Sequence, residues 1–327
     1  MRAPGSPTRA GRRGLAYLQL SGTALFWGAN FIVAKILMEE WPPDRFSGVR
    51  IAFAALMLAA VATWRGQRWR WPAAAWGCLA AAGAVGIGLN NALLYGGLRV
   101  TSAAHASLIM ALSPVGTAAV MVLSREERFT ALRALAMLLA VAGAAVVILP
   151  VGGPAGAAGH APGAVLHGGD LAVFGAMACS SISFLFLKRG LRHVDPLSAT
   201  AVTLTAGALV LLPPAIGEHM RAGAGAPGVV AVLLASAVLS MGLGTLWWNA
   251  GVAALGAQRT VVFNDVVPAV TLALGALFIH APITWRDVAG FVLIGAAVAV
   301  NVLPDGAPAP PTGATPVRPG PPSVEPA

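Results

Sequence analysis

The sequence contains few charged residues and few cysteines. Only 10% of its 327 residues are charged, whereas about 25% is usual for a soluble domain, and 57% are hydrophobic, with a mean hydropathy of +0.77. Cys78 and Cys179 both lie in long apolar runs, where cysteine usually acts as a small buried side chain, so no disulfide framework is predicted. This composition excludes an ordinary soluble domain and indicates an integral membrane protein.

The sequence also lacks the patterns on which enzyme active sites depend. It shows no nucleophile paired with a base, no metal-ligand spacing and no glycine loop of the kind that binds phosphate. Asp265 lies in the middle of a long apolar run and has no second carboxylate near it for acid–base chemistry. We therefore expect no enzymatic activity, no metal and no cofactor.

Long apolar runs dominate what is present. A bilayer core about 30 Å thick requires about 20 mostly apolar residues for each helix. Cutting the chain at its charged, glycine-rich or proline-rich breaks gives ten such runs, at 15–37, 45–64, 72–96, 102–123, 131–150, 170–188, 196–215, 228–250, 257–279 and 285–303. The arginine-rich residues 1–14 and the proline-rich residues 304–327 are predicted to be disordered tails, and the Gly/Ala-rich residues 151–169 a linker.

The basic residues are distributed unevenly between the predicted loops. If the N-terminus is cytoplasmic, fifteen of the 21 lysines and arginines lie on the cytoplasmic side. Because cytoplasmic loops are enriched in these residues, we predict that both termini are cytoplasmic. This orientation explains the net charge of +9 without a nucleic-acid partner.

The two halves of the chain resemble each other when it is shifted by 153 or 154 residues. The halves are residues 15–150 and 170–303, with five predicted spans each. Because five is odd, two halves with the same fold enter the membrane in opposite directions. The prediction is an all-α integral membrane protein with ten transmembrane helices as two inverted five-helix repeats, an architecture typical of transporters. The matched pairs include Phe31 and Phe184, Lys35 and Lys188, Gly88 and Gly242, Gly97 and Gly251, and Pro114 and Pro268.

Several of these segments resemble a known family. The stretches "ALFWGANFIVAK", "PPDRFSGVRIAFAALML", "LRVTSAAHASLIMALSPVGTAAVMVLSREERFT" and "GDLAVFGAMACSSISFLFLKR" are similar to the EamA-type ten-helix members of the drug/metabolite transporter superfamily. The resemblance implies gradient-driven export of small metabolites, amino acids or drugs across a bacterial inner membrane. The chain departs from the family at "LGALFIHAPIT", where the usual acidic turn is missing and His280 lies nearby.

Asp265 is the acidic residue that lies in the middle of a predicted span, within "FNDVVPAV". A charged side chain there costs about 2.5–3.5 kcal/mol, so it is a functional candidate, and we assign it to proton coupling. The alternative is a structural carboxyl that bonds a neighbouring helix or pairs with Arg259. Nearby, Pro268 and its counterpart Pro114 are expected to break their helices at a substrate site, or simply to kink them.

Other polar residues in the spans are candidates for binding or gating. His105 and Arg259 occupy equivalent positions and could form matched gates, or could reach the two interfaces; His105 is the second proton-coupling candidate. Ser180, Ser181 and Ser183 are the approximate repeat counterparts of Trp27 and Asn30, whereas Trp247 and Trp248 are interpreted as interfacial anchors. The substrate-binding candidates are Trp27, Asn30, Asn90, Asn91, Tyr95, Ser113 and Asn264.

These observations predict a secondary transporter that exports small metabolites, amino acids or drugs by alternating access with proton coupling. Two alternatives remain open: a passive facilitator in which Asp265 is structural, and a non-transporting receptor or assembly subunit. The expected partners are a small-molecule substrate and the lipid bilayer. The glycine-rich segments allow close helix packing, within one chain or in a homodimer.

Overall fold

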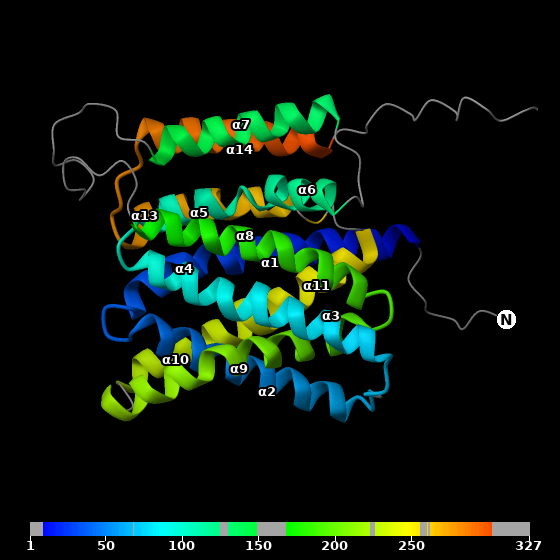
Figure 1. Ribbon diagram of the computed structural model, residues 1–327. Helices are drawn as coiled ribbons and strands as arrows, with labels where there is room; N and C mark the ends of the chain where they lie inside the picture. Colours follow the sequence, from blue (N-terminus) through cyan, green and yellow to red (C-terminus); the bar gives the residue numbers. More distant parts are fainter. Residues whose placement is uncertain are drawn as a thin grey trace, which may run out of the picture.

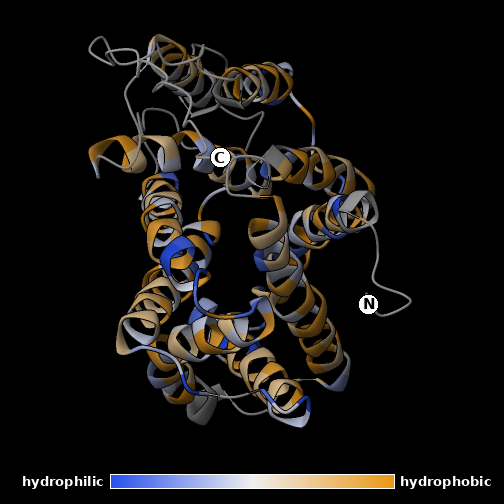
Figure 2. Ribbon diagram, turned by 90° about the vertical axis from the view of Figure 1, so that its right-hand side faces the viewer, coloured by the Kyte–Doolittle hydropathy of each residue, from blue (hydrophilic) through white to orange (hydrophobic). Residues whose placement is uncertain are grey.

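The computed structural model describes residues 9–67, 69–124, 130–148, 168–222, 226–255, 260 and 262–302. All regular elements within these ranges are helical. Figure 1 shows the longer helices lying side by side along one direction, and Figure 2 shows the same bundle nearly end-on, with apolar residues predominating along the ribbons.

Each of the ten predicted spans contains at least one helix. The α1 helix begins at Arg9, six residues before the predicted span, since arginine favours helix and continues it beyond the apolar run. The helices are α1 (Arg9–Leu37), α2 (Pro43–Trp64), α3 (Ala73–Gly83), α4 (Asn90–Leu98), α5 (Ala103–Met110), α6 (Ser113–Leu123), α7 (Ala131–Ile148), α8 (Gly168–Gly190), α9 (Pro196–Ala222), α10 (Pro227–Ser236), α11 (Thr245–Leu255), α13 (Val266–Phe278) and α14 (Trp285–Val302).

Seven helical stretches of the described chain are long and apolar enough to cross a membrane. Their surfaces expose many large apolar side chains, such as Leu56 and Leu209, as expected where lipid replaces water. The shorter apolar α13 adds to them. The seven are Arg13–Leu37, Pro43–Trp64, Ala73–Leu98, Ala103–Leu123, Gly168–Gly190, Pro196–Gly217 and Pro227–Leu255. The protein is therefore built as a multi-pass membrane protein; that ten helices cross remains a prediction.

The packing joins helices from the two halves of the chain. The α2 helix packs along α9, and α7 packs along α14 as a pair at one side of the bundle (Figure 1). The α1 helix contacts α13 and α11, whereas α8 contacts α6 and α4. The halves are thus interleaved, and neither forms a separate core.

Two equivalent helices run in opposite directions. The Lys35 ammonium, in the last turn of α1, donates to the carbonyl oxygens of Leu98 and Thr101 at 2.8 and 2.9 Å. The Thr101 hydroxyl donates in turn to the carboxylate of Asp170, in the first turn of α8. Since α1 ends where α8 begins, the two helices are antiparallel.

The helix geometry is interrupted at equivalent places in the two halves. A π-helical segment, Ala84–Leu89 (η1), joins α3 to α4, and another, Ala237–Gly244 (η2), joins α10 to α11. Between α5 and α6 the helix is broken at Ala111 and Leu112, and Pro114 is the second residue of α6. A 3₁₀ turn, Val262–Asp265 (η3), precedes α13, whose third residue is Pro268. Segments of this kind free backbone groups and often occur at functional sites.

Candidate functional site

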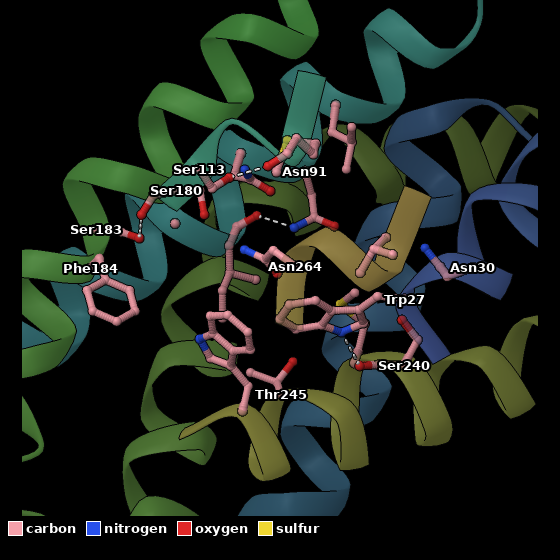
Figure 3. Close-up of a pocket in the computed structure, with 18 of the residues that line it drawn as sticks. Trp27, Asn30, Asn91, Ser113, Ser180, Ser183, Phe184, Ser240, Thr245 and Asn264 are labelled. Atoms are coloured by element: carbon pink, nitrogen blue, oxygen red, sulfur yellow. Dashed lines mark hydrogen bonds between the residues drawn. The ribbon is translucent and has the colours of Figure 1, made fainter. Parts of the chain in front are cut away.

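A central cavity of about 180 Å³ lies where these interruptions meet. It is lined from α1, α3, α4, α5, α6, α8, α9, α11 and α13, from both π-helical segments and from η3. Figure 3 shows Ser180, Ser183 and Phe184 of α8 on one side and Trp27 and Asn30 of α1 on the other, with Asn264 between them. An interior cavity between helices is the usual place for a small-molecule site in a helical bundle.

All seven predicted substrate-binding residues line this cavity: Trp27, Asn30, Asn90, Asn91, Tyr95, Ser113 and Asn264. Hydrogen bonds hold several of them. The Trp27 indole donates to the Ser240 carbonyl at 3.1 Å, and the Asn90 amide to the Ala176 carbonyl at 2.6 Å. Their binding role stays a prediction, but the structure brings them to one place.

The described lining is polar without being charged. Asparagine, serine and threonine side chains supply amides and hydroxyls, and Trp27, Phe31, Phe184 and Trp248 supply aromatic surface. The Trp27 and Trp248 rings lie 5.1 Å apart. Such a lining accommodates a small solute that has both an apolar part and hydrogen-bonding groups.

Two polar atoms at the cavity have no hydrogen-bond partner in the described structure. One is the Oδ1 acceptor of Asn91, whose amide nitrogen donates to the Ile87 carbonyl at 2.8 Å. The other is the Ser240 hydroxyl, whose residue is only 2% exposed. Buried polar atoms normally find partners, so these two are unsatisfied groups beside the cavity.

A buried arginine next to the cavity, Arg50, was not among the candidates of the sequence analysis. Arg50 of α2 is fully buried, and its guanidinium donates to the Oδ1 of Asn30 and, at 2.8 Å, to the Tyr95 hydroxyl. It also lies 4.4 Å from the Phe46 ring centroid. The sequence feature that could have identified Arg50 is a charged residue inside an apolar run, seven residues after the start of α2.

Of the two proton-coupling candidates, the structure describes the side chain of His105 only. The backbone of Asp265 lies in η3, beside Asn264, and its side chain lies outside the described part, as does Arg259. His105 is half-buried in the first turn of α5, where its backbone N–H donates to the Ser102 hydroxyl at 3.0 Å; it does not line the cavity. The roles of Asp265 and His105 stay predictions.

The interpretation of both tryptophans of α11 as interfacial anchors is wrong for Trp248. Trp248 is buried and lines the cavity, whereas Trp247 stacks on Phe26 at 5.7 Å. Successive residues on a helix point about 100° apart, so the two neighbours face different surroundings. Of the serines, Ser180 and Ser183 line the cavity, and Ser181 packs beside Gly116.

Comparison with known proteins agrees with this architecture. The model of the EamA-like transporter family matches the chain twice, over residues 14–149 and 167–303. A solved structure described as "Crystal structure of protein" has the same fold, with a TM-score of 0.64 at 19% identity, covering 88% of this chain and 98% of its own.

Curated relatives are named as transporters. The uncharacterized transporter YyaM of Bacillus subtilis (strain 168) is 28% identical over 284 residues, covering 85% of this chain and 90% of its own length. An uncharacterized transporter of Archaeoglobus fulgidus is 24% identical over 287 residues, covering 87% and 98%. Together with the double match, these relatives indicate a transporter. The chain belongs to the EamA-like transporter family.

Proposed function

We propose that the protein is a secondary transporter that moves a small solute by alternating access through the central cavity. One observation carries this proposal: the cavity is lined by matching positions of the two halves. The structure describes 27 lining residues, and twenty of them form ten pairs. The two members of each pair are 153 or 154 positions apart in the sequence, so both halves contribute equivalent positions to the lining. The pairs include Phe31 and Phe184, Trp27 and Ser180, Asn91 and Thr245, Leu94 and Trp248, and Met110 and Asn264.

The close helix contacts support an arrangement of inverted repeats. Three close contacts between a glycine and a side chain of another helix occur twice in the structure. In the second occurrence both contact positions are shifted by 153 or 154 residues, so they are the equivalent positions of the other half. In each pair a Cβ atom at the glycine would approach its partner side chain to within 3 Å. The pairs are Gly28 with Val270 and Gly116 with Ser181, Gly88 with Val210 and Gly242 with Met57, and Gly97 with Val173 and Gly251 with Leu20.

The direction of the helices supports the same arrangement. Since α1 and α8 occupy equivalent positions and run antiparallel, the halves are related by an axis perpendicular to the helices, which is an axis in the membrane plane. Repeats related in this way can exchange their conformations, so that a central site faces each side of the membrane in turn. An inverted repeat has no evident use in a receptor or scaffold, which favours transport over a non-transporting role.

Orientation, direction and coupling complete the proposal. We place both termini in the cytoplasm because the basic residues concentrate in the loops that this orientation makes cytoplasmic. We place the protein in the inner membrane because of its resemblance to the family. Export driven by a proton gradient follows the resemblance to the family, with Asp265 as the proton-binding group. No catalytic step is required, since conformational exchange around a bound solute is sufficient.

Flux through reconstituted protein tests this function. Purified protein in lipid vesicles is assayed with radiolabelled amino acids, nucleosides and cationic drugs, with and without a pH gradient. We expect accumulation of at least one solute that depends on the gradient. Equilibration without accumulation would identify a facilitator, and no flux of any solute would favour a non-transporting protein.

A matched pair of variants links that flux to the cavity. Ser180→Trp places an indole in a cavity of about 180 Å³ and should abolish flux. Leu209→Trp adds the same side chain at a position of α9 that is 71% exposed, where flux should persist. Equal flux in the two variants would remove the cavity from the transport path.

A further inference from the structure

We infer that the substrate carries a carboxylate, and that the Arg50–Asn30–Tyr95 cluster is the subsite that recognises it. This inference rests on the proposed function, because it assigns the substrate class of the same cavity. It starts from the burial of Arg50, which is 0% exposed and lies behind the two lining residues Asn30 and Tyr95. A guanidinium is always charged and can only donate hydrogen bonds.

The donor character of Arg50 fixes the orientation of the Asn30 amide. Because the guanidinium cannot accept, the Asn30 atom that faces it is the carbonyl oxygen Oδ1. The Asn30 amide nitrogen then faces the Tyr95 hydroxyl, to which it donates at 2.7 Å. No other assignment of the amide satisfies both contacts.

The Tyr95 hydroxyl consequently accepts two hydrogen bonds. One comes from Asn30 and the other from Arg50, at 2.7 and 2.8 Å. A phenol oxygen bonded to two donors keeps its own proton for a third group, and no described residue accepts it. Tyr95 is 1% exposed and lines the cavity, so the group available to this proton is a bound solute.

The charge of the cluster selects the kind of acceptor. Within the described residues Arg50 bonds two neutral side chains and no carboxylate. A buried cation without a counter-charge is unfavourable in a membrane protein, and it polarises the Tyr95 O–H toward stronger donation. A carboxylate that accepts this proton also places its negative charge near the guanidinium, which a neutral amide cannot do.

The rest of the lining describes the remainder of the solute. Phe31, Phe184 and Trp248 offer apolar and aromatic surface, and the amides and hydroxyls between them are neutral. The preferred ligand is therefore a small amphipathic carboxylate. A solute that carries only a cation, such as an amine drug, meets donors at this subsite and is disfavoured.

Three probes with the same phenyl group test the inference by calorimetry on the purified full-length protein. Phenylacetate carries the carboxylate, phenylacetamide is its neutral counterpart and phenethylamine is the cation. We expect phenylacetate to bind about ten- to a hundredfold more tightly than phenylacetamide, the size of a hydrogen bond to a charged group. Equal binding of acid and amide, tighter binding of the amine, or no binding of phenylacetate at millimolar concentration would overturn the inference.

The two tyrosines of the chain provide a matched pair of variants. Tyr95→Phe removes only the hydroxyl and should abolish the preference for the acid, whereas Tyr17→Phe removes a hydroxyl outside the cavity lining, on a residue 41% exposed, and should retain it. A preference unchanged in Tyr95→Phe contradicts the inference. If Tyr95→Phe does not fold, the comparison of probes on the unmodified protein still decides.

The two proposals fail in different ways. If vesicles show gradient-dependent flux but acid and amide bind equally, the transport function stands and the carboxylate subsite does not. If phenylacetate binds with the expected preference but no solute crosses the membrane, the subsite stands and the transport function does not.

Discussion

The contact between α4 and α8 gives a prediction that can be worked out from distances. Gly97 and Gly169 face each other at the end of the bundle where Lys35 lies. A Cβ atom at Gly97 would lie 2.5 Å from the Gly169 carbonyl oxygen and 2.9 Å from the Val173 side chain. The first of these is a backbone atom, so a methyl group at Gly97 can be accommodated only if the two helices move apart.

The preceding residue provides the control. Gly96 lies on the exposed face of the same helix, and a Cβ atom there meets no described atom within 4 Å. Replacing a glycine by alanine in a helix interior gains about 0.8–1 kcal/mol, and overpacking costs about 1–3 kcal/mol. Gly96→Ala should therefore stabilise the protein slightly, and Gly97→Ala should be less stable than Gly96→Ala by about 1–3 kcal/mol, because helix propensity cancels between them.

Thermal unfolding of the detergent-solubilised protein measures the difference. At about 2–4 °C for each kcal/mol, the midpoint of Gly97→Ala should fall at least about 2 °C below that of Gly96→Ala. The equivalent variant Gly251→Ala meets the Leu20 side chain at 2.6 Å instead of a backbone atom, so its cost should be smaller. Equal midpoints for Gly96→Ala and Gly97→Ala would refute the close approach of α4 and α8.

Three further predictions concern topology, coupling and the end of the bundle. Reporter fusions after Arg128 and Arg192 should report the cytoplasm, and fusions within 220–226 the outside; opposite locations for the first two would refute the ten-span model. Asp265→Asn keeps size and hydrogen bonding but cannot ionise, so it should lose flux driven by a pH gradient while retaining exchange; unaltered driven flux would make the carboxylate structural. Lys35→Met removes two charged hydrogen bonds to the Leu98 and Thr101 carbonyls and should lower stability by about 1–3 kcal/mol in the same thermal assay, whereas no loss would show that water replaces the ammonium.

The helical segments and the cavity residues could be predicted because membrane sequences carry strong constraints. Long apolar runs must form helices in a bilayer, so the runs separated by charged breaks all contain helices. Polar residues such as Asn30 and Asn90 inside those runs avoid lipid, so they face the interior and meet there. Pro114 marks a helix break for a reason visible in the sequence, since proline has no backbone donor.

The remaining features depend on which way individual side chains face. Arg50 was not among the candidate residues, and only the fold shows that it is buried and held by Asn30 and Tyr95. Trp248 was grouped with Trp247 because tryptophan is common at interfaces, and helix rotation separated them. The π-helical segments have no sequence signature in either half, apart from glycines that also occur in regular membrane helices.

The cavity combines a symmetric position with asymmetric chemistry. The residues equivalent to Arg50, Asn30 and Tyr95 are Thr203, Ser183 and Asn249, a neutral set that also lines the cavity. The charged donors therefore belong to the first half only, although both halves surround the solute. If the halves exchange conformations, the scaffold reverses its access while the charge remains on the same helices, because no residue changes identity. A solute with one carboxylate would then keep one orientation relative to the first half in both states, and a single subsite would suffice for the whole cycle.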